Sequence, residues 1–349
     1  MFPYFVLFFI IIILYLFCKD CCGKEYIKKY NFIIAIIFIL FISFRNEKVG
    51  ADIVTYKRWY LMIENQSFST LLENRQWEIG YIVLNKILNI MFSASGFRVM
   101  LVIVAVFAIV PIALFINQYS KMPWLSWLLY LSLNYLIYPM SGLRACIAMS
   151  FGVLSFKYLW LPVTKKNVSC FYLFAILACG FHTTAVVYLF LYPMCKIKSN
   201  WIIFSFFIIF AGIFLFFGDR IIIFLIKTFY PSYQMESAGG YGLLIFLIGC
   251  VIAGLLFVPK SRRKDNANQV LFRIICCCLV LQLLTLKFSL FSRVVEFFLI
   301  ACIVYIPYVI SVMEYNKNIA MSAVVIGAFL LLYLNLQANG ANIVPYAFF

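Results

Sequence analysis

One arginine interrupts the apolar sequence near the middle of the chain. Arg144 lies in Tyr138-Pro-Met-Ser-Gly-Leu-Arg-Ala-Cys-Ile-Ala-Met, where proline and glycine separate two apolar segments. An arginine inside a membrane helix costs about 2.5 to 3.5 kcal/mol on insertion scales, and its forked donors suit a phosphate held by two hydrogen bonds. We therefore predict that Arg144 binds a phosphate or forms an internal ion pair with Glu78 or Glu296, two roles that are compatible.

His182 is the only histidine and lies in Ala178-Cys-Gly-Phe-His-Thr-Thr-Ala. It marks the tip of a predicted hairpin whose arms are too short for the tip to reach the outer surface of a membrane, so we expect it in a cavity. A neutral imidazole there could act as a base or as a hydrogen-bond donor. A lone histidine is more often structural, so this alternative stays open.

Carboxylates beside aromatic side chains follow the second apolar segment. Asp52 and Tyr56 lie in Arg45-Asn-Glu-Lys-Val-Gly-Ala-Asp-Ile-Val-Thr-Tyr, and a tryptophan precedes Glu78-Ile-Gly-Tyr81. Sugar sites combine such groups, because rings cover apolar sugar faces while acids bind or deprotonate hydroxyls. Aromatic residues make up 19% of the chain and form interfacial belts in any membrane protein, so the pattern alone does not establish a sugar ligand.

A second arginine and an acid lie one helical turn apart near the end of the chain. Arg293 and Glu296, at positions i and i+3, either pair with each other or bring another cation to the phosphate site predicted around Arg144. Three further basic residues are expected to extend their charged heads to the membrane interface: Arg98, Arg220 and Lys287.

The composition requires a membrane environment for these residues. Of 349 residues, 66% are hydrophobic and 11% are charged, against ~45 to 50% apolar and ~25% charged in soluble domains. Apolar runs continue from end to end, which predicts one all-α, polytopic membrane domain over residues 1–349. At ~20 residues a span, the chain allows about 12 transmembrane helices, with a range of about 10 to 13.

The net charge of +16 is explained first by topology. Half of the 28 Lys and Arg residues fall in a few short polar breaks, and basic residues concentrate in cytoplasmic loops. We therefore predict no nucleic-acid partner and place both termini outside. The cytoplasmic breaks are 19–30, Lys121, 165–167, 196–200, 260–269 and 313–317.

The predicted crossings leave one segment that does not span. Segment 78–95 is the most polar candidate, with Asn85, Lys86 and Asn89, so we expect an interfacial or re-entrant helix within an outer-face region at 45–97. The predicted spans are 2–17, 31–44, 98–117, 124–139, 142–161, 168–180, 183–195, 201–217, 241–258, 270–286, 293–312 and 319–334.

The cysteines do not form a disulfide framework. Three of the 12 are consecutive and most lie in apolar runs, so they are interpreted as small buried hydrophobic residues. No His-rich or Gly-rich phosphate motif occurs and a single histidine excludes a multi-histidine metal site, so we expect no metal and no cofactor.

At the residues above, the sequence resembles the EpsG family of polysaccharide biosynthesis proteins, related in role to Wzy O-antigen polymerases. One departure is Ile53, where a small polar residue is expected after the aspartate. The matching pieces, in order, are Arg45 with Val49-Gly-Ala-Asp-Ile-Val-Thr-Tyr56, Glu78-Ile-Gly-Tyr81, Gly142-Leu-Arg-Ala-Cys-Ile-Ala148, Leu177-Ala-Cys-Gly-Phe-His-Thr-Thr184 and Pro345-Tyr346.

The resemblance implies a polymerase of the bacterial cytoplasmic (inner) membrane that joins O-antigen, capsule or similar repeat units carried on undecaprenyl pyrophosphate, facing the periplasm or exterior. A GT-C-like arrangement of helices is compatible with it. Expected partners are the lipid-linked oligosaccharide, membrane lipids, and a chain-length regulator or flippase. An O-antigen ligase, a flippase or transporter, and a membrane acyltransferase remain alternatives.

The predicted site combines these residues. Glu78 or His182 is the base and Asp52 orients the acceptor sugar. Pyrophosphate and sugar are bound by Arg144, Arg293, Arg45, Tyr56 and Tyr81.

Overall fold

The computed structural model describes residues 1–19, 24–64, 66–74, 77–197, 240–286 and 291–349, with a few single residues between 205 and 220. Within these residues the secondary structure is helical, and the one β-type pairing is the isolated bridge between Arg45 and Phe348. The all-α prediction is therefore confirmed. The predicted span 201–217 falls mostly outside the described residues, as does Lys287.

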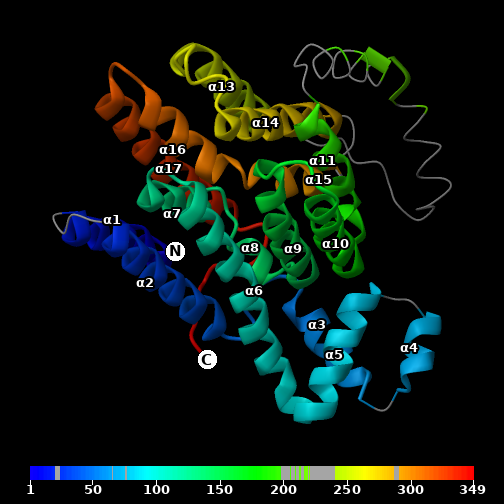
Figure 1. Ribbon diagram of the computed structural model, residues 1–349. Coiled ribbons are helices and arrows are strands. Elements are labelled where there is room, and N and C mark those ends of the chain that lie inside the picture. The colour runs from blue at the N-terminus through cyan, green and yellow to red at the C-terminus, as the bar shows by residue number, and fades with distance from the viewer. Residues whose placement is uncertain are drawn as a thin grey trace. The chain divides into compact units, whose positions relative to one another are not determined.

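The chain forms two compact units. The first comprises Met1–Val186 and Tyr315–Phe349, and the second comprises Val187–Glu314. Figure 1 shows the elements of the first unit: α1 (Phe2–Lys19), α2 (Lys24–Ser43), α3 (Ile53–Met62), α4 (Phe68–Asn74), α5 (Ile79–Phe92), η1 (Ser93–Ser95), α6 (Gly96–Tyr119), α7 (Pro123–Ser132), α8 (Ile137–Met140), α9 (Leu143–Trp160), α10 (Lys165–Phe181) and α17 (Lys317–Ala338).

The second unit begins within a short 3-10 helix and is otherwise α-helical where it is described. Its elements are η2 (Thr183–Val187), which crosses the boundary, α11 (Tyr188–Lys196), α13 (Tyr241–Phe257), α14 (Asn266–Thr285), α15 (Phe291–Leu299) and α16 (Cys302–Val312).

Four stretches of the described chain are long and apolar enough to cross a membrane: Glu25–Ser43, Ile79–Tyr119, Asn266–Thr285 and Lys317–Ala338. A fifth results if α15 and α16, bent by 44° at their junction, form one span. Phe2–Cys18 and Tyr241–Phe257 are apolar but shorter. The helices fit an integral membrane protein, and the larger count of about 12 spans stays a prediction.

One predicted span is broken. Segment 124–139 forms α7 and α8 with a turn between them, where Asn134 adopts a left-handed conformation with φ of 68°. Asparagine tolerates this conformation better than most residues, and hydropathy carries no signal for it. With 10 residues, α7 is ~15 Å long, too short to cross a bilayer as one straight helix.

The polar segment 78–95 forms α5 and η1, its polar residues have internal partners, and its failure to span stays a prediction. The chain turns back between α5 and α6 at η1 (Figure 1). Lys86 Nζ donates to the carbonyls of Ile63, Glu64 and Gln66 at 3.1, 3.2 and 2.8 Å, which fixes the loop after α3. The opposite face of α5 is exposed and apolar, and this fits a helix at a membrane interface.

The helices of the first unit pack through α6, which contacts α2 on one side and α9 on the other, while α9 packs along α10. A buried polar link joins three of them. Asn31 of α2 donates to the Ala113 carbonyl of α6 at 2.9 Å and accepts from Trp127 Nε1 of α7 at 2.5 Å. Buried polar groups with partners on different helices fix one arrangement of those helices.

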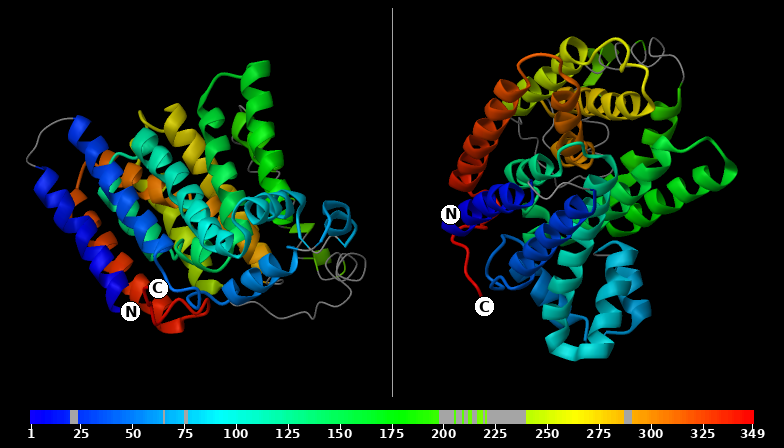
Figure 2. Two further views of the ribbon diagram at one scale, coloured as in Figure 1. Left: turned by 90° about the horizontal axis from the view of Figure 1, so that it is seen from below. Right: turned by 60° about the vertical axis from the view of Figure 1, so that its left-hand side comes forward.

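The C-terminal tail folds back on the loop that follows α2. Backbone amides of Asn46, Gly50 and Ala51 donate to carbonyls of the tail at 2.8 to 3.0 Å. Tyr4 Oη donates to the Ile343 carbonyl at 2.7 Å, so both termini lie at one end of this unit, as Figure 2 also shows. The loop 45–52 is thus held by the tail on one side.

Gly50 is required by the close approach of this loop to α8. Its φ is +116°, and a Cβ atom there would lie 1.9 Å from the Met140 carbonyl oxygen. Gly50→Ala should therefore destabilise the protein by more than about 1 kcal/mol. Gly327→Ala in α17, where a Cβ atom meets nothing within 4 Å, is the control. We expect a lower melting temperature for the first variant in detergent, and equal melting temperatures would contradict this role of the loop.

Candidate active site

Glu78 lies at the first turn of α5 and uses its carboxylate to join other helices. Its backbone is extended (φ −64°, ψ 146°) and its side chain makes no cap hydrogen bond to α5. Oε2 accepts from Arg144 Nη1 of α9. Oε1 lies 3.2 Å from His182 Nδ1 and accepts from the Thr183 amide at 3.2 Å. One carboxylate therefore connects three segments that are far apart in sequence.

Arg144 is held on several sides near the start of α9. In addition to the Glu78 ion pair, its Nε lies 3.5 Å from Tyr56 Oη, and its guanidinium stacks 4.0 Å from the centre of the Trp77 ring. Such stacking stabilises a cation and keeps the planar donor group in one orientation. Its side chain is 21% exposed, so the guanidinium is fixed by protein contacts and still reaches the surface of the site.

His182 ends α10, with an extended backbone (φ −156°, ψ 122°) and its amide bonded to the Ala178 carbonyl. Its side chain and that of Glu78 are each 11% exposed. An ionised carboxylate only accepts hydrogen bonds. In neutral His182, Nδ1 therefore carries the proton that faces Glu78, and Nε2 carries the lone pair. In Ser-His-Asp triads, a carboxylate fixes the tautomer of the imidazole by the same kind of hydrogen bond to Nδ1–H.

The charges around Glu78 keep it ionised. Burial by itself raises the pKa of this carboxyl, but the hydrogen bond from His182, the charge of Arg144 and hydrogen bonds from the backbone and Arg144 outweigh it and lower the pKa to about 2. Glu78 is therefore a carboxylate at any physiological pH, which makes it a poor proton acceptor. Of the two bases predicted from the sequence, the geometry favours His182.

Asp52 and Tyr56 lie one turn apart at the start of α3. Asp52 is exposed, and its Oδ2 lies 3.5 Å from Ser141 Oγ, which also accepts from the Asp52 amide at 3.2 Å. Burial raises the pKa of the Tyr56 phenol, while the Arg144 charge opposes that rise. Tyr56 thus lies beside Arg144, its predicted role in substrate binding stays a prediction, and Asp52 lies at the accessible end of the same helix.

Two predicted ligands are buried instead. Arg45 is 0% exposed, and its Nη1 and Nη2 donate to the carbonyls of Ile42 and Pro139 at 2.6 and 2.8 Å. Tyr81 is also fully buried, with its hydroxyl 3.7 Å from Met100 Sδ. These placements do not fit direct contact with a pyrophosphate or sugar. Arg45 instead connects the end of α2 to α8, just before Arg144.

Arg293 lies exposed in α15 of the second unit. Its participation in the site stays a prediction.

The sequence did not single out the aromatic support of the site. The rings of Trp59 and Tyr81 stack at 5.8 Å, and both contact Trp77, at 5.8 and 6.0 Å. Trp77 in turn carries the guanidinium of Arg144. Its position directly before Glu78 was a signal, but in a chain with 19% aromatic residues one tryptophan is not distinctive. The amide of Thr183 was missed for a different reason. Backbone donors occur at almost every residue, so the sequence does not show which of them will bind the carboxylate.

Apolar helices of membrane-spanning length, together with a carboxylate that joins an imidazole to a guanidinium, define an integral membrane protein with a polar site. A comparison with protein families matches residues 28–348 to the EpsG family, nearly the whole chain. The chain belongs to this family, whose members are Wzy-like polysaccharide polymerases, which confirms the resemblance in the sequence. No curated protein and no solved structure matches it.

The low pKa of Glu78 makes a pH-dependent prediction. Its pKa falls from 4.5 to about 2 on folding, so the carboxylate stabilises the fold fully above about pH 5, and this contribution is lost as the pH falls toward 2. At pH 7, Glu78→Gln should reduce the free energy of unfolding by up to about 3 kcal/mol. The difference in melting temperature from wild type should shrink between pH 5 and 3.

Glu73→Gln, an exposed position in α4, is the matched control and should behave as wild type at each pH. A deficit of Glu78→Gln that is the same at pH 7 and pH 3 would contradict the ion-pair account.

Proposed function

We propose that this chain polymerises oligosaccharide repeat units at the outer face of the bacterial cytoplasmic membrane by glycosyl transfer that needs no metal ion. The donor is the growing glycan on undecaprenyl pyrophosphate, and the acceptor is a lipid-linked repeat unit. The observation that carries the proposal is the Glu78 carboxylate between His182 and Arg144 in a member of the EpsG family.

The reaction exchanges one glycosyl bond for another and moves one proton, which the imidazolium later releases to the leaving pyrophosphate or to water. A hydroxyl oxygen of the acceptor sugar attacks the anomeric carbon of the donor glycan, and its proton passes to His182 Nε2. The bond between the anomeric carbon and the pyrophosphate oxygen breaks, and undecaprenyl pyrophosphate leaves with the electron pair. Glu78 holds the imidazole in the required tautomer and stabilises the imidazolium that forms.

Arg144 supplies the cation for the leaving group. Before reaction, Arg144 and Glu78 neutralise each other beside a neutral imidazole. When His182 takes the proton, the three groups together carry one positive charge, just as negative charge develops on the leaving pyrophosphate. Fixed charges that match the transition state in this way are a major source of catalysis. Asp52 and Tyr56 orient the acceptor, and Arg293 is proposed as a second phosphate ligand.

The direction of the helices supports an outward-facing site. Arg98, near the start of α6, donates to the Arg45 carbonyl after the end of α2 at 2.8 Å, and Arg45 donates to Pro139 before the start of α9. These helix ends therefore lie together, on the side of the site. The basic breaks lie at the other ends of the same helices, and positive loops face the cytoplasm: residues 24–30, Lys121 and residues 165–167.

The test is polymerisation by the purified full chain supplied with a defined undecaprenyl-pyrophosphate-linked repeat unit. His182→Gln and Arg144→Gln should each lower kcat by about 100-fold or more, while the chain keeps its size-exclusion profile. Arg262→Gln, a change at an exposed arginine (64%) outside the site, is the control. Normal product ladders from His182→Gln or Arg144→Gln would overturn the role of that residue.

A deletion strain separates the proposal from its rivals. Loss of a polymerase leaves single repeat units on the lipid acceptor. Full-length polymer that stays on the undecaprenyl carrier would instead indicate a ligase, and lipid-linked repeats confined to the inner leaflet would indicate a flippase. Either of these results would contradict the proposal.

A further inference from the structure

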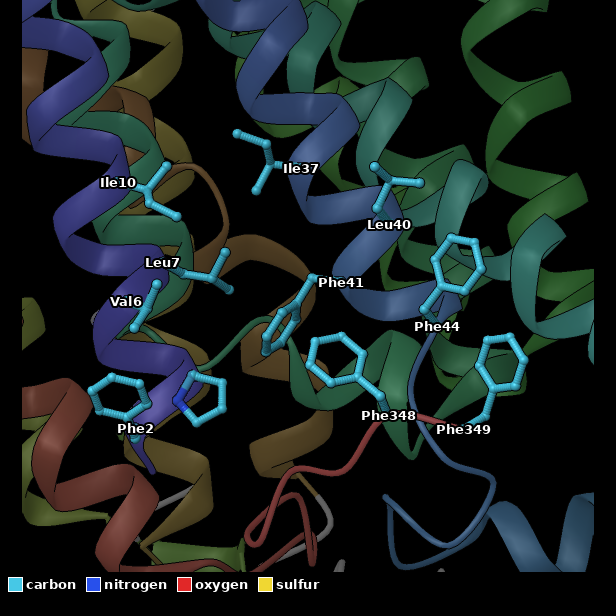
Figure 3. Close-up of a pocket in the computed structure, with 11 residues that line it drawn as sticks. Phe2, Val6, Leu7, Ile10, Ile37, Leu40, Phe41, Phe44, Phe348 and Phe349 are labelled. Carbon is cyan, nitrogen blue, oxygen red and sulfur yellow. The ribbon is translucent and has the colours of Figure 1, made fainter.

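An apolar groove lies between α1 and α2 in the first unit, away from Glu78. The two helices diverge toward the ends that carry the N-terminus and residue 44, and the C-terminal tail closes this end (Figure 3). Leu7 and Phe41 are buried in it, while Val6, Leu40 and the phenyl groups at its rim are exposed. The lining comes from residues 2–10 of α1, residues 37–44 at the end of α2, and Phe348 and Phe349 of the tail.

The size of the groove matches one hydrocarbon chain. Its volume is about 740 Å³, within the ~300 to 1,000 Å³ of small-molecule pockets. A methylene group takes about as much space as a water molecule, ~30 Å³, so the groove holds on the order of 25 carbon groups. This is enough for several isoprene units of a single chain. Neither a whole undecaprenyl chain nor both acyl chains of a phospholipid fit in it, so the rest of either lipid would extend into the bilayer.

Cations lie at the closed end of the groove. The guanidinium of Arg98 stacks 4.5 Å from the centre of the Phe349 ring, which lines the groove. Glu47 is the acid at this end, and it pairs with both Arg98, at 3.4 Å, and Lys57, at 2.5 Å. Two cations share this carboxylate, so the three side chains together sum to one positive charge. An apolar groove that ends at a partly exposed cation complements a lipid with a phosphate head.

We propose that this groove binds the polyprenyl chain of an isoprenoid lipid phosphate, with the phosphate at Arg98 and Lys57. The identity of the lipid rests on the proposed function, in which such a lipid carries the glycan. The groove and the catalytic residues share one structural element. Arg98 donates to the Arg45 carbonyl at the start of loop 45–52. Asp52 ends that loop one turn before Tyr56, whose hydroxyl lies 3.5 Å from Arg144 Nε.

The arrangement gives the tail a function. Tyr346 stacks on Phe41 at 4.2 Å, and Phe349 stacks on Phe44 at 5.5 Å, so aromatic rings of the tail close the groove between the ends of two helices. A chain in the groove would contact these rings, and its head would lie next to the loop that leads to the site. The lipid in the groove is therefore the carrier of the acceptor repeat unit, because Arg144 takes the pyrophosphate that leaves the donor.

Photolabelling tests this proposal without catalysis. The purified full chain is placed in phosphatidylcholine nanodiscs with undecaprenyl phosphate that carries a photoreactive group on its prenyl chain. Labels should concentrate on residues 2–10 and 37–44. Val6→Trp and Leu40→Trp, which fill the groove from exposed positions, should each reduce labelling roughly tenfold. Ile13→Trp, at an exposed position of α1 outside the groove, is the matched control and should leave it unchanged.

The head group is tested by charge. Wild type should label more strongly with photoreactive undecaprenyl phosphate than with photoreactive undecaprenol, and Arg98→Gln should remove this preference. Lys48→Gln, a change at an exposed lysine of the same loop, should keep it. Three results would overturn the proposal. Labels could spread evenly over the lipid-facing helices, or Ile13→Trp could lose as much labelling as Val6→Trp and Leu40→Trp. Unlabelled phosphatidylglycerol could also displace the probe as well as unlabelled undecaprenyl phosphate does.

The outcome is separable from that of the proposed function. Groove labelling without polymerisation would support the proposed lipid site and contradict the proposed polymerase activity. The opposite result is polymerisation without groove labelling, with unchanged kinetics in Val6→Trp and Leu40→Trp. It would support the polymerase activity and contradict the lipid site.

Discussion

The arrangement of the site depends on one carboxylate shared by an arginine and a histidine. Removing Glu78 from water is costly, and two charge-assisted hydrogen bonds and an amide offset that cost. Without it, Arg144 would keep a positive charge in a largely buried setting, and His182 would have no fixed tautomer. The start of α9 and the end of α10 are therefore joined to the start of α5 by the same bonds that, in the proposed mechanism, orient the imidazole and the guanidinium. Stability and function are coupled at this point, because a change that loosens the pair also misplaces the base.

A second layer of contacts supports that carboxylate. Two sets of contacts hold loop 45–52. Its first residue, the buried Arg45, donates to the Pro139 carbonyl, and amides of the loop donate to carbonyls of the C-terminal tail. Gly50 lets the loop approach α8. This loop presents Asp52 and starts the helix that carries Tyr56. The motif residues of the family thus divide into two kinds. Arg45 and Gly50 shape the framework, whereas Glu78, Arg144 and His182 are joined in the proposed site.

Sequence reasoning selected the residues of the proposed site because their types are costly in an apolar chain. An arginine after a Pro and Gly break, a single histidine and a carboxylate before a helix each required an explanation, and the ion pair between Arg144 and Glu78 was one of the two roles predicted. It assigned Arg45 and Tyr81 to binding because a sequence shows residue type but not burial. It also missed the break at Asn134, since a left-handed turn inside an apolar run leaves hydropathy unchanged.

The most direct test of the central claim is the tautomer of His182. The chain has one histidine, so protein purified with a tag free of histidine and labelled with ¹⁵N-histidine gives nitrogen NMR signals from this site alone. The account predicts a neutral imidazole with the proton on Nδ1 and an unprotonated Nε2, and loss of that preference in Glu78→Gln. A proton on Nε2 in the wild-type protein would contradict it, because the nitrogen assigned as the base would then have no lone pair to accept the proton of the attacking hydroxyl.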